Sequence, residues 1–323
     1  MRTIREVAQR AGVSVGTVSN VLSGAVPVSE RLRHRVLQAI QELDYHPNHL
    51  ARSLKVKQTQ MIGMVIRNIA DPVIPQMLRG AEDAAWFQNY LLVLLNSNEQ
   101  PDREQQILRA LRTRRVDGIL LATDSTANRP HIRALSEAGT PVVSLEREIP
   151  GLDLDWVGAD DAGGAMNCVR HLARQGRRSI GWIHPPAGDL AARERFEGYR
   201  RGLQEAGIEF QQALVAEAKS ATGLFTRNPR PDAVLAADAL LVPKLLRALS
   251  EHGLRAPDNV AIATFDEPRL CEALQVTTVL RPSYEIGFRA MELLIQRIQD
   301  AKRPRATVAL PCSLQVPPLE DAR

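Results

Sequence analysis

The sequence predicts an α/β protein in which a small helical head precedes a larger body built on parallel sheets. From Met61 onward, short apolar runs typical of buried strands alternate with helical stretches. Before Met61 the apolar residues recur at helical spacing instead, and basic residues gather there. We therefore divide the chain into a head at residues 1–46, a linker at 47–60 and a body at 61–323.

Composition limits the class of protein. A chain of 323 residues with 44% hydrophobic and 24% charged residues predicts two domains, or three at most, and excludes wholesale disorder. The longest apolar runs are too short to span a bilayer, and the first ten residues lack the apolar segment of a secretory signal. The three cysteines, Cys168, Cys271 and Cys312, are too far apart for a disulfide framework or a metal cluster. We expect a soluble cytosolic protein without a metal or a cofactor.

The pattern of apolar and capping residues in the head predicts three short helices. Apolar residues at helical spacing predict a first helix that ends at Gly12. Ser14 can cap a second helix over about Val15–Leu22 by accepting a hydrogen bond from a free backbone N–H. Ser29 is placed to cap a third helix, and Pro47 prevents its continuation. Two short helices joined by a glycine-containing turn, with a third that completes a small core, describe a helix-turn-helix unit.

Charge is unevenly distributed along the chain. Residues 1–57 hold nine Lys and Arg against four Asp and Glu, whereas the remaining residues hold 32 against 33. A basic head on a nearly neutral body indicates that the head meets a polyanion. A solvated basic surface is the alternative, which charge by itself favours.

The body alternates strands and helices. Seven strand-like runs are MIGMVIR, YLLVLLN, GILLAT, PVVSLE, SIGWIH, AVLAA and VAIATF. The helical stretches lie at about Pro75–Gln88, Asp102–Arg115, Asp161–Arg174, Arg193–Glu205 and Leu240–His252. This order implies parallel sheets with helices on both faces, arranged as one sheet or as two similar halves.

Several segments carry a family resemblance. TIREVAQRAGVSVGTVSNVLSG and YHPNHLARSLKVKQTQMIG closely resemble the DNA-binding headpiece and hinge of the LacI/GalR transcriptional repressors. NSNEQPDREQQILRALRTRRVDGILL, RERFEGYRRGL, VAIATFDE and RPSYEIGFRAMELL continue the resemblance in the family's order over nearly the whole chain. It implies a helix-turn-helix head, a hinge helix, and a core like periplasmic sugar-binding proteins with two α/β subdomains around a ligand cleft.

The resemblance implies which residues meet DNA. Val15, Gly16 and Asn20 match the positions that read bases in the major groove. Asn20 can bond bidentately to adenine and Val15 can contact a thymine methyl, whereas Gly16 offers no side chain. Short hydroxyl side chains nearby suit phosphate contacts, although each can equally be a cap or a solvated helix residue. The polar residues assigned to DNA in the head are Thr3, Ser14, Thr17, Ser19 and Ser29.

The resemblance also assigns a hinge helix to residues 48–54. Leu54 matches a leucine that wedges into the minor groove at the operator centre, and Ala51 matches a small residue that lets two hinge helices approach. Asn48 and Arg52 join the expected DNA contacts. An anchoring core residue is the alternative reading of Leu54. Because two hinges are needed, the resemblance implies a homodimer on a pseudo-palindromic site.

An effector site is implied between the two subdomains. Val73 and Ile74 are expected to line one wall, and Glu146, Arg195 and Asp266 to face the ligand with polar groups. An arginine with two carboxylates can bond ligand hydroxyls through charge-assisted hydrogen bonds. A structural network of ion pairs is the alternative.

The chain departs from the family's ligand pattern at three places. Ala237 stands where an asparagine usually bonds the sugar, Lys219 stands near the usual position of a stacking aromatic, and residues 216–229 are shorter than the family norm. The basic side chains of Lys219 and Arg195 would favour an anionic effector, such as a sugar acid or sugar phosphate, which is one alternative. Loss of effector sensing is another.

Other functional classes find less support. The sequence lacks a nucleophile elbow, a P-loop, a metal-ligand cluster and paired catalytic acids, so we expect no enzyme and assign no catalytic residue. A periplasmic solute-binding protein would have no use for residues 1–57. We therefore predict a cytoplasmic, nucleoid-associated transcriptional repressor that a small sugar-like effector releases from its operator. A constitutive or corepressor-dependent regulator remains the alternative.

Overall fold

The computed structural model describes residues 2–23, 26–45, 58–186, 190–266, 269 and 273–318. The chain divides into two compact units, Met1–Thr59 and Gln60–Arg323, which we describe separately as the head and the body. In the described part of the chain, the helices are all too short or too polar to cross a membrane.

The head is a helix-turn-helix unit, as predicted. Its helices are α1 (Ile4–Ala11), α2 (Val15–Ser23) and α3 (Glu30–Glu42). Thr3 and Glu6 form a reciprocal capping box at the start of α1, and Gly12 ends that helix in the left-handed region at φ 61°. Arg35 of α3 donates to the carbonyl of Ala11 at 2.5 Å, which ties the third helix to the end of the first. The small core that results consists of Val7, Ala8, Ala11, Val18, Val36, Ala39 and Tyr45.

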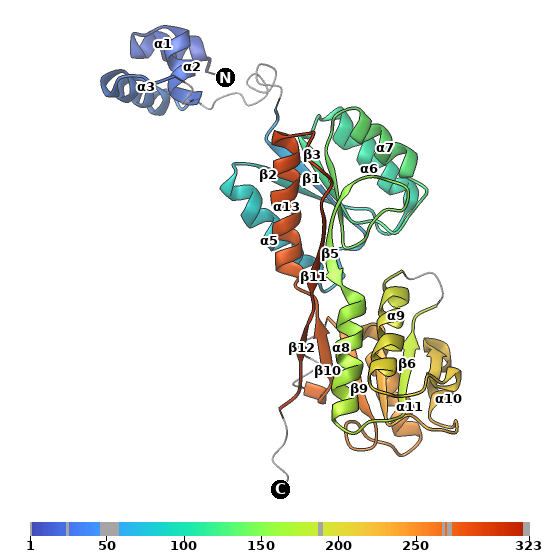
Figure 1. The fold of residues 1–323 in the computed structure, drawn as a ribbon. Helices are drawn as coiled ribbons and strands as arrows, with labels where there is room; N and C mark the ends of the chain where they lie inside the picture. The colour runs from blue at the N-terminus through green and yellow to red at the C-terminus, as the bar shows by residue number, and fades with distance from the viewer. Residues whose placement is uncertain are drawn as a thin grey trace. The chain divides into compact units, whose positions relative to one another are not determined.

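The body consists of two halves, each built on a six-stranded sheet (Figure 1). The first half has the strand order β11-β5-β4-β3-β1-β2 and the second half has the order β12-β10-β9-β8-β6-β7. The strands of the first half are β1 (Met61–Ile66), β2 (Leu91–Asn96), β3 (Gly118–Leu121), β4 (Val142–Leu145), β5 (Asp155–Asp160) and β11 (Thr307–Pro311). Those of the second half are β6 (Ile180–His184), β7 (Val215–Glu217), β8 (Ala233–Ala236), β9 (Ala261–Phe265), β10 (Thr277–Leu280) and β12 (Ser313–Gln315). Of the two predicted arrangements, the structure therefore has two similar halves.

Helices cover both faces of each sheet. The first half carries α5 (Ile74–Phe87), α6 (Pro101–Thr113), α7 (Arg129–Glu137) and α13 (Ser283–Gln299). The second half carries α8 (Asp161–Arg174), α9 (Leu190–Glu205), α10 (Ala221–Leu224) and α11 (Val242–Glu251). Side chains of β1 alternate between the two faces, since Met64 packs with α5 and α13 while Val65 packs against the α6 and α7 side. In the shortened stretch at 216–229, the end of β7 is followed by a 3₁₀ turn and the four-residue α10.

The chain crosses between the halves three times (Figure 1). The crossings lie between β5 and α8, at Arg281–Pro282 between β10 and α13, and at Cys312 between β11 and β12. The prediction of parallel sheets is confirmed, with one exception among the described strands, since β12 pairs antiparallel with β10. The reason is topological. β10 leads out of the second half, whereas β12 enters it directly from β11, which runs parallel to β5.

Glycines allow the paired helices of each half to touch through their backbones. A Cβ at Gly287 of α13 would lie 1.9 Å from the carbonyl oxygen of Met77 in α5, and one at Gly80 would lie 2.0 Å from that of Tyr284. In the second half, a Cβ at Gly198 of α9 would lie 2.0 Å from the carbonyl oxygen of Ala162 in α8. These helix pairs therefore have no room for a side chain at the crossing point.

We expect Gly287→Ala to destabilise the body by about 1–3 kcal/mol, because a methyl group would overlap backbone atoms that cannot rotate away. Helix propensity by itself acts in the opposite direction, since alanine is favoured over glycine within a helix by up to about 1 kcal/mol. Gly223→Ala in α10 is the matched control, because a Cβ there meets no atom within 4 Å of the described structure. Urea unfolding of both variants checks this, and equal midpoints would contradict the packing argument.

Candidate functional site

The start of α2 presents an exposed polar face in the head. The Ser14 hydroxyl accepts from the backbone N–H of Thr17 at 3.1 Å, so the predicted cap is present, and the two hydroxyls lie 2.9 Å apart. Val18 is fully buried and fixes the rotation of the helix, while Val15 is 42% exposed. Gly16 is exposed beside Val15, and Ser19 and Asn20 are half-buried. The structure thus brings the predicted α2 residues together on one short helix.

Thr3 and Ser29 lie at the starts of the other two helices of the head. Thr3 is exposed and accepts from Glu6 as a cap. The prediction that the Ser29 side chain caps α3 is wrong, because its hydroxyl makes no capping hydrogen bond. The backbone carbonyl of Ser29 instead accepts from the Arg33 N–H at 3.0 Å and starts the helix without the side chain. The hinge residues Asn48, Ala51, Arg52 and Leu54 lie outside the described residues.

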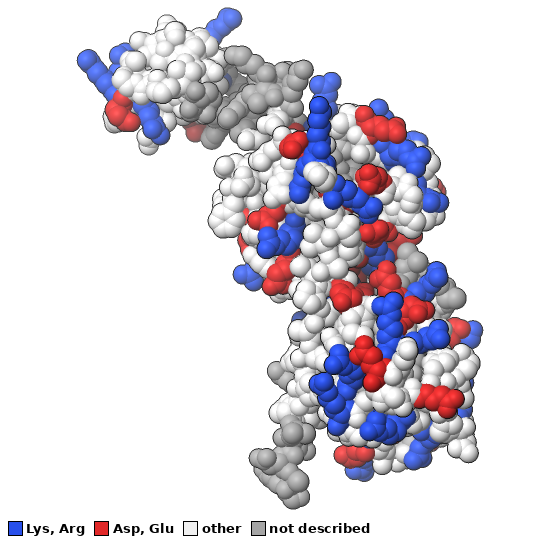
Figure 2. Space-filling model, viewed as in Figure 1, with Lys and Arg blue, Asp and Glu red and all other residues white. Residues whose placement is uncertain are grey.

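In the body, two carboxylates occupy equivalent places in the two halves. Glu146 directly follows β4, and Asp266 directly follows β9. Both residues are left-handed with φ 63°, a conformation that costs free energy for a residue with a side chain. Each donates its backbone N–H at 2.9 Å to the neighbouring strand, Glu146 to Val157 and Asp266 to Val279. The shared turn directs both carboxylates to the junction between the halves, where Figure 2 shows acidic and basic side chains side by side.

Arg281 joins these two carboxylates. Its Nε lies 2.8 Å from Oδ2 of Asp266, and its Nη1 lies 3.0 Å from Oε1 of Glu146. Arg281 belongs to the crossing between β10 and α13, and its side chain is buried. Burial by itself would lower the pKa of Arg281, but the surrounding carboxylates raise it well above its ordinary value, so the guanidinium stays charged.

Arg195 of α9 contacts the same cluster from the second half. Its Nη2 lies 3.3 Å from the carboxylate of Asp161 and 3.4 Å from that of Asp266. Its Nη1 donates to the Ala237 carbonyl at 2.6 Å, and its guanidinium stacks 4.0 Å above the Phe265 ring. Nε of Arg195 is buried without a hydrogen-bond partner among the described residues. Arg195, Glu146 and Asp266 are thus brought together, as one connected network of ion pairs.

The first half supplies two further arginines. Arg67 follows β1 and pairs with Glu146 at 3.4 Å and with Asp124. Arg147 lies 3.1 Å from the Asp124 carboxylate and reaches Glu194 of the second half at 4.0 Å. Arg147 is buried, and its Nε and Nη1 lack a partner with hydrogen-bond geometry in the part of the chain that the structure describes. These N–H groups can donate hydrogen bonds to ligand oxygens.

The remaining predicted effector residues are placed differently. Val73 and Ile74 are buried in the core of the first half at the start of α5, beside Asp71, whose pKa burial raises. Lys219 is exposed and pairs with Glu217 at 3.1 Å. Among the described contacts, none joins Lys219 to the cluster around Arg195. Ala237 contributes its carbonyl rather than a side chain.

Sequence reasoning missed part of this cluster. The missed residues all lie within five positions after the carboxyl end of a strand, where ligands of parallel sheets bind. That position is the signal that could have found them. They are Arg67, Asp71, Asp124, Arg147, Asp161 and Arg281.

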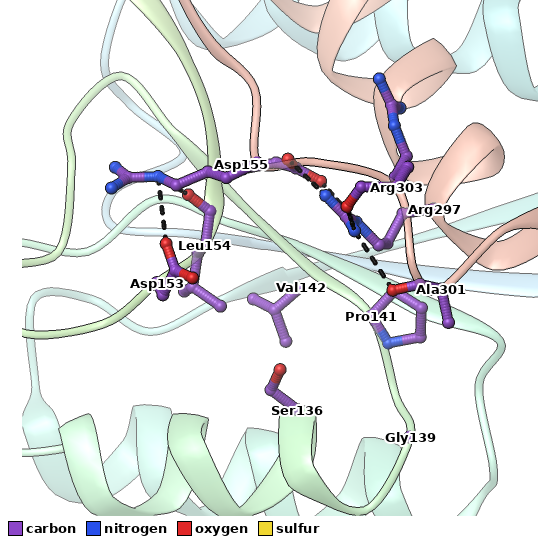
Figure 3. Close-up of a pocket in the computed structure, with 11 residues that line it drawn as sticks. Ser136, Gly139, Pro141, Val142, Asp153, Leu154, Asp155, Arg297, Ala301 and Arg303 are labelled. Atoms are coloured by element: carbon purple, nitrogen blue, oxygen red, sulfur yellow. Dashed lines mark hydrogen bonds and ion pairs between the residues drawn. The ribbon is translucent and has the colours of Figure 1, made fainter.

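A separate cavity of about 350 Å³ lies at the opposite end of the first sheet, near the starts of β4 and β5 (Figure 3). Arg297 of α13 dominates it, and both of its ion-pair distances to Asp155 are 2.9 Å. The other donors of Arg297 bond the carbonyls of Ala301, Arg303 and Pro304. This guanidinium is saturated by the protein, so we interpret it as a clamp on the end of α13 rather than as a ligand contact.

Two protein-family models match the chain. One, described as bacterial regulatory proteins of the lacI family, matches residues 3–48. The other, described as periplasmic binding proteins and sugar binding domain of the LacI family, matches residues 59–315.

Similar proteins match over nearly the full length. The ribose operon repressor of Halalkalibacterium halodurans is 34% identical over 314 residues, which cover 95% of this chain and 93% of that protein. The solved complex of the transcriptional regulator CelR with cellobiose is 30% identical, covers 98% of this chain and 99% of that chain, and has a TM-score of 0.71. The lac repressor dimer bound to operator and the anti-inducer ONPF is 22% identical over 98% of each chain, and its TM-score of 0.82 shows the same fold.

We expect Glu146→Gln to cost about 3 kcal/mol of stability at neutral pH, because it leaves buried guanidinium groups uncompensated. Burial raises the pKa of Glu146, but Arg281, Arg67 and Arg147 outweigh it and hold the pKa below the ordinary 4.5. A lowered folded-state pKa gives stability that is present above pH 4.5 and is lost as the pH falls through the folded pKa. The difference between wild type and variant should therefore shrink below pH 4.5.

Thermal melts from pH 7 down to about pH 3 measure this difference. Glu137→Gln, on an exposed position of α7, is the control and should match wild type throughout. A gap between wild type and Glu146→Gln that stays constant across this range would contradict the assignment.

Proposed function

The chain belongs to the LacI family of bacterial regulatory proteins, and from this premise we propose that it is a dimeric repressor which a small polyhydroxylated effector releases from DNA. The observation that best supports this proposal is that one chain holds two chemically separate sites. One is an exposed recognition helix in the head, and the other is a buried cluster of paired charges between two α/β halves. The similar proteins are regulators rather than enzymes, and we place this one in the cytoplasm with its DNA.

The DNA site comprises α2 and the hinge. We assign base reading to Val15, Gly16 and Asn20 of α2, and phosphate contacts to the hydroxyl residues of the head. The exposure of Val15 and Gly16 at the start of α2 supports this assignment. For the hinge the family resemblance is the support, and it assigns the minor-groove wedge to Leu54. The remaining assigned contacts are Thr3, Ser14, Thr17, Ser19, Ser29, Asn48, Ala51 and Arg52.

We assign the dimer contact to the outer edge of the first half. β2 is the last strand of its sheet, and its sequence LLVLLN carries no charge that would prevent edge pairing. Trp86 and Phe87 at the end of α5 are 79% and 74% exposed, and Leu91 at the start of β2 is 61% exposed. A second copy is the occupant we assign to this patch, because an edge strand can meet its own two-fold mate and a palindromic site requires two heads.

The effector site is assigned to the charged junction. Its four arginines, Arg67, Arg147, Arg195 and Arg281, form ion pairs with four of the cluster's carboxylates, Asp124, Glu146, Asp161 and Asp266. This balance supports a neutral polyhydroxylated ligand, since a hydroxyl can donate to a carboxylate and accept from a guanidinium. The similarity to the ribose operon repressor and to the CelR–cellobiose complex also supports a sugar or sugar derivative.

Release follows from linkage between the two sites. An effector that binds the closed form of the body more tightly shifts the population toward it. If that form separates the paired hinges, bound effector lowers the affinity for the operator, and bound operator lowers the affinity for the effector by the same factor. A corepressor would reverse the sign of this coupling.

To test the DNA site, genomic fragments that bind the protein are selected first, and binding of the recovered site is then measured by fluorescence anisotropy at fixed salt. Asn20→Ala should lose about 1–3 kcal/mol on the recovered site and little on unrelated DNA, because it removes a base contact. Ser19→Ala is the matched control, since a lost phosphate contact lowers both affinities by the same factor. Equal losses for the two variants on both DNAs would contradict the assignment of Asn20.

To test the dimer contact, Trp86→Glu places a charge against its own copy. We expect sedimentation equilibrium to show mainly monomers, and the affinity for the recovered site to fall at least about tenfold, because a half-site complex lacks its partner. Val316→Glu, beyond the edge strand β12 of the other sheet, is the control and should leave the dimer intact. A Trp86→Glu protein that remains dimeric would remove this patch from the interface.

A further inference from the structure

Arg281 is the buried side chain that spans the junction. It is anchored on the second half by two contacts to Asp266, from Nε at 2.8 Å and from its backbone N–H at 3.4 Å. From there it reaches Glu146 of the first half at 3.0 Å. Both members of the Arg281–Glu146 pair are nearly inaccessible, with 8% and 3% of their side chains exposed.

Among the described residues, no other ion pair of the cluster joins the two halves at so short a distance and with so little exposure. Arg67 and Asp124 bind partners within the first half, and Arg195 binds partners on the second-half side. The ion pair between Arg147 and Glu194 also spans the halves, but it is 4.0 Å long and the glutamate side chain is 56% exposed. Water and salt weaken such an exposed pair, whereas they barely reach Arg281.

We propose that Arg281 is a built-in clamp that biases the two halves of the body toward the closed arrangement in the absence of effector. The pair sits directly on one of the three chain crossings, about which the halves would have to move. Opening the junction pulls Glu146 away from Arg281 and leaves a buried carboxylate without its nearest cation, which is unfavourable. The clamp therefore biases the closed arrangement through the same two carboxylates that the effector is assigned to contact.

This clamp goes beyond effector binding, because it sets the closure equilibrium before any ligand arrives. An effector adds only the difference between its own contacts with the two states. A chain with a strong clamp has a more closed resting state, and so a smaller range over which the effector can act. Weakening the clamp should open the unliganded body.

The full-length dimer serves for the test. Spin labels carried by noncanonical amino acids replace Arg112 of α6 and Arg201 of α9, which are exposed and belong to different halves. Dilution with unlabelled protein gives dimers with one labelled copy. Pulsed electron paramagnetic resonance then measures the distribution of distances between the halves.

Relative to wild type, we expect a broader distribution for Arg281→Gln, shifted by several ångströms. Arg281→Lys, which keeps the charge, should fall between them. Arg297→Gln is the matched control, because it breaks a buried arginine–carboxylate pair with Asp155 that lies wholly within the first half. It should leave the distance distribution unchanged even where it lowers stability.

The proposal is contradicted if Arg281→Gln keeps the wild-type distribution of distances, or if Arg297→Gln broadens that distribution equally. Should Arg281→Gln fail to fold, Glu146→Gln removes the other partner and is judged by the same criteria. Operator binding separates this inference from the proposed release mechanism. If closure releases DNA, Arg281→Gln should bind the recovered site several-fold more tightly without effector. A changed distance distribution with unchanged operator affinity would support the clamp and overturn the link between closure and release.

Discussion

The arrangement of the body depends on compensation of charge buried where the two sheets meet. Glu146 and Asp266 leave their strands in the same left-handed turn, so each half delivers a carboxylate to the junction. A carboxylate removed from water is expensive unless cations and hydrogen bonds surround it. The guanidiniums of Arg281 and Arg195 supply that compensation on the second-half side, and Arg67 supplies it on the first. The junction therefore responds as one electrostatic unit, in which each ion depends on its neighbours.

Rigid halves make such a junction effective. In each half a helix pair is in direct backbone contact, at Gly287 between α5 and α13 and at Gly198 between α8 and α9. Close contact of this kind leaves little freedom for the helices to slide within a half. The three chain crossings are then the places where the body can bend most easily. A contact at a crossing, such as that of Arg281, acts on the relative position of the halves more than on either half alone.

Local signals in the sequence were sufficient for most elements. The seven apolar runs all became strands, and the Gly12 and Ser14 signals placed the turn of the head correctly. Three of the five missed strands have weak local signals, whereas β10 (TTVL) and β11 (TVALP) are rich in β-branched residues and could have been predicted. β5 begins and ends with aspartate, and β7 and β12 have three residues each, so tertiary pairing rather than composition makes them strands. The hydroxyl of Ser29 shows the same limit, since residue type indicated a cap that the backbone made unnecessary.

The sequence could not predict which charged residues, far apart in the chain, form ion pairs with one another. Glu146, Arg195 and Asp266 were found through a family pattern, but nothing local indicated that Arg281, 135 positions after Glu146, would lie between the two carboxylates. Only the packing of the two halves against each other brings the ends of β4, β9 and β10 to one junction. Sequence reading could therefore name members of the cluster without predicting how they neutralise one another.

This neutralisation supports our proposal of a neutral ligand over the anion that the sequence left open. Arg195 and Lys219 together favoured an anion, but Arg195 is engaged by Asp161, Asp266 and a carbonyl, while Lys219 pairs with Glu217 in an exposed position. An anion that took the place of one of these carboxylates beside its arginine would leave that carboxylate buried without compensation, which is costly. A hydroxyl avoids that cost, because it can donate to the carboxylate and accept from the guanidinium without changing the net charge. The pairing among the protein's own charges thus supports the proposed neutral, hydroxyl-rich ligand more directly than any single residue does.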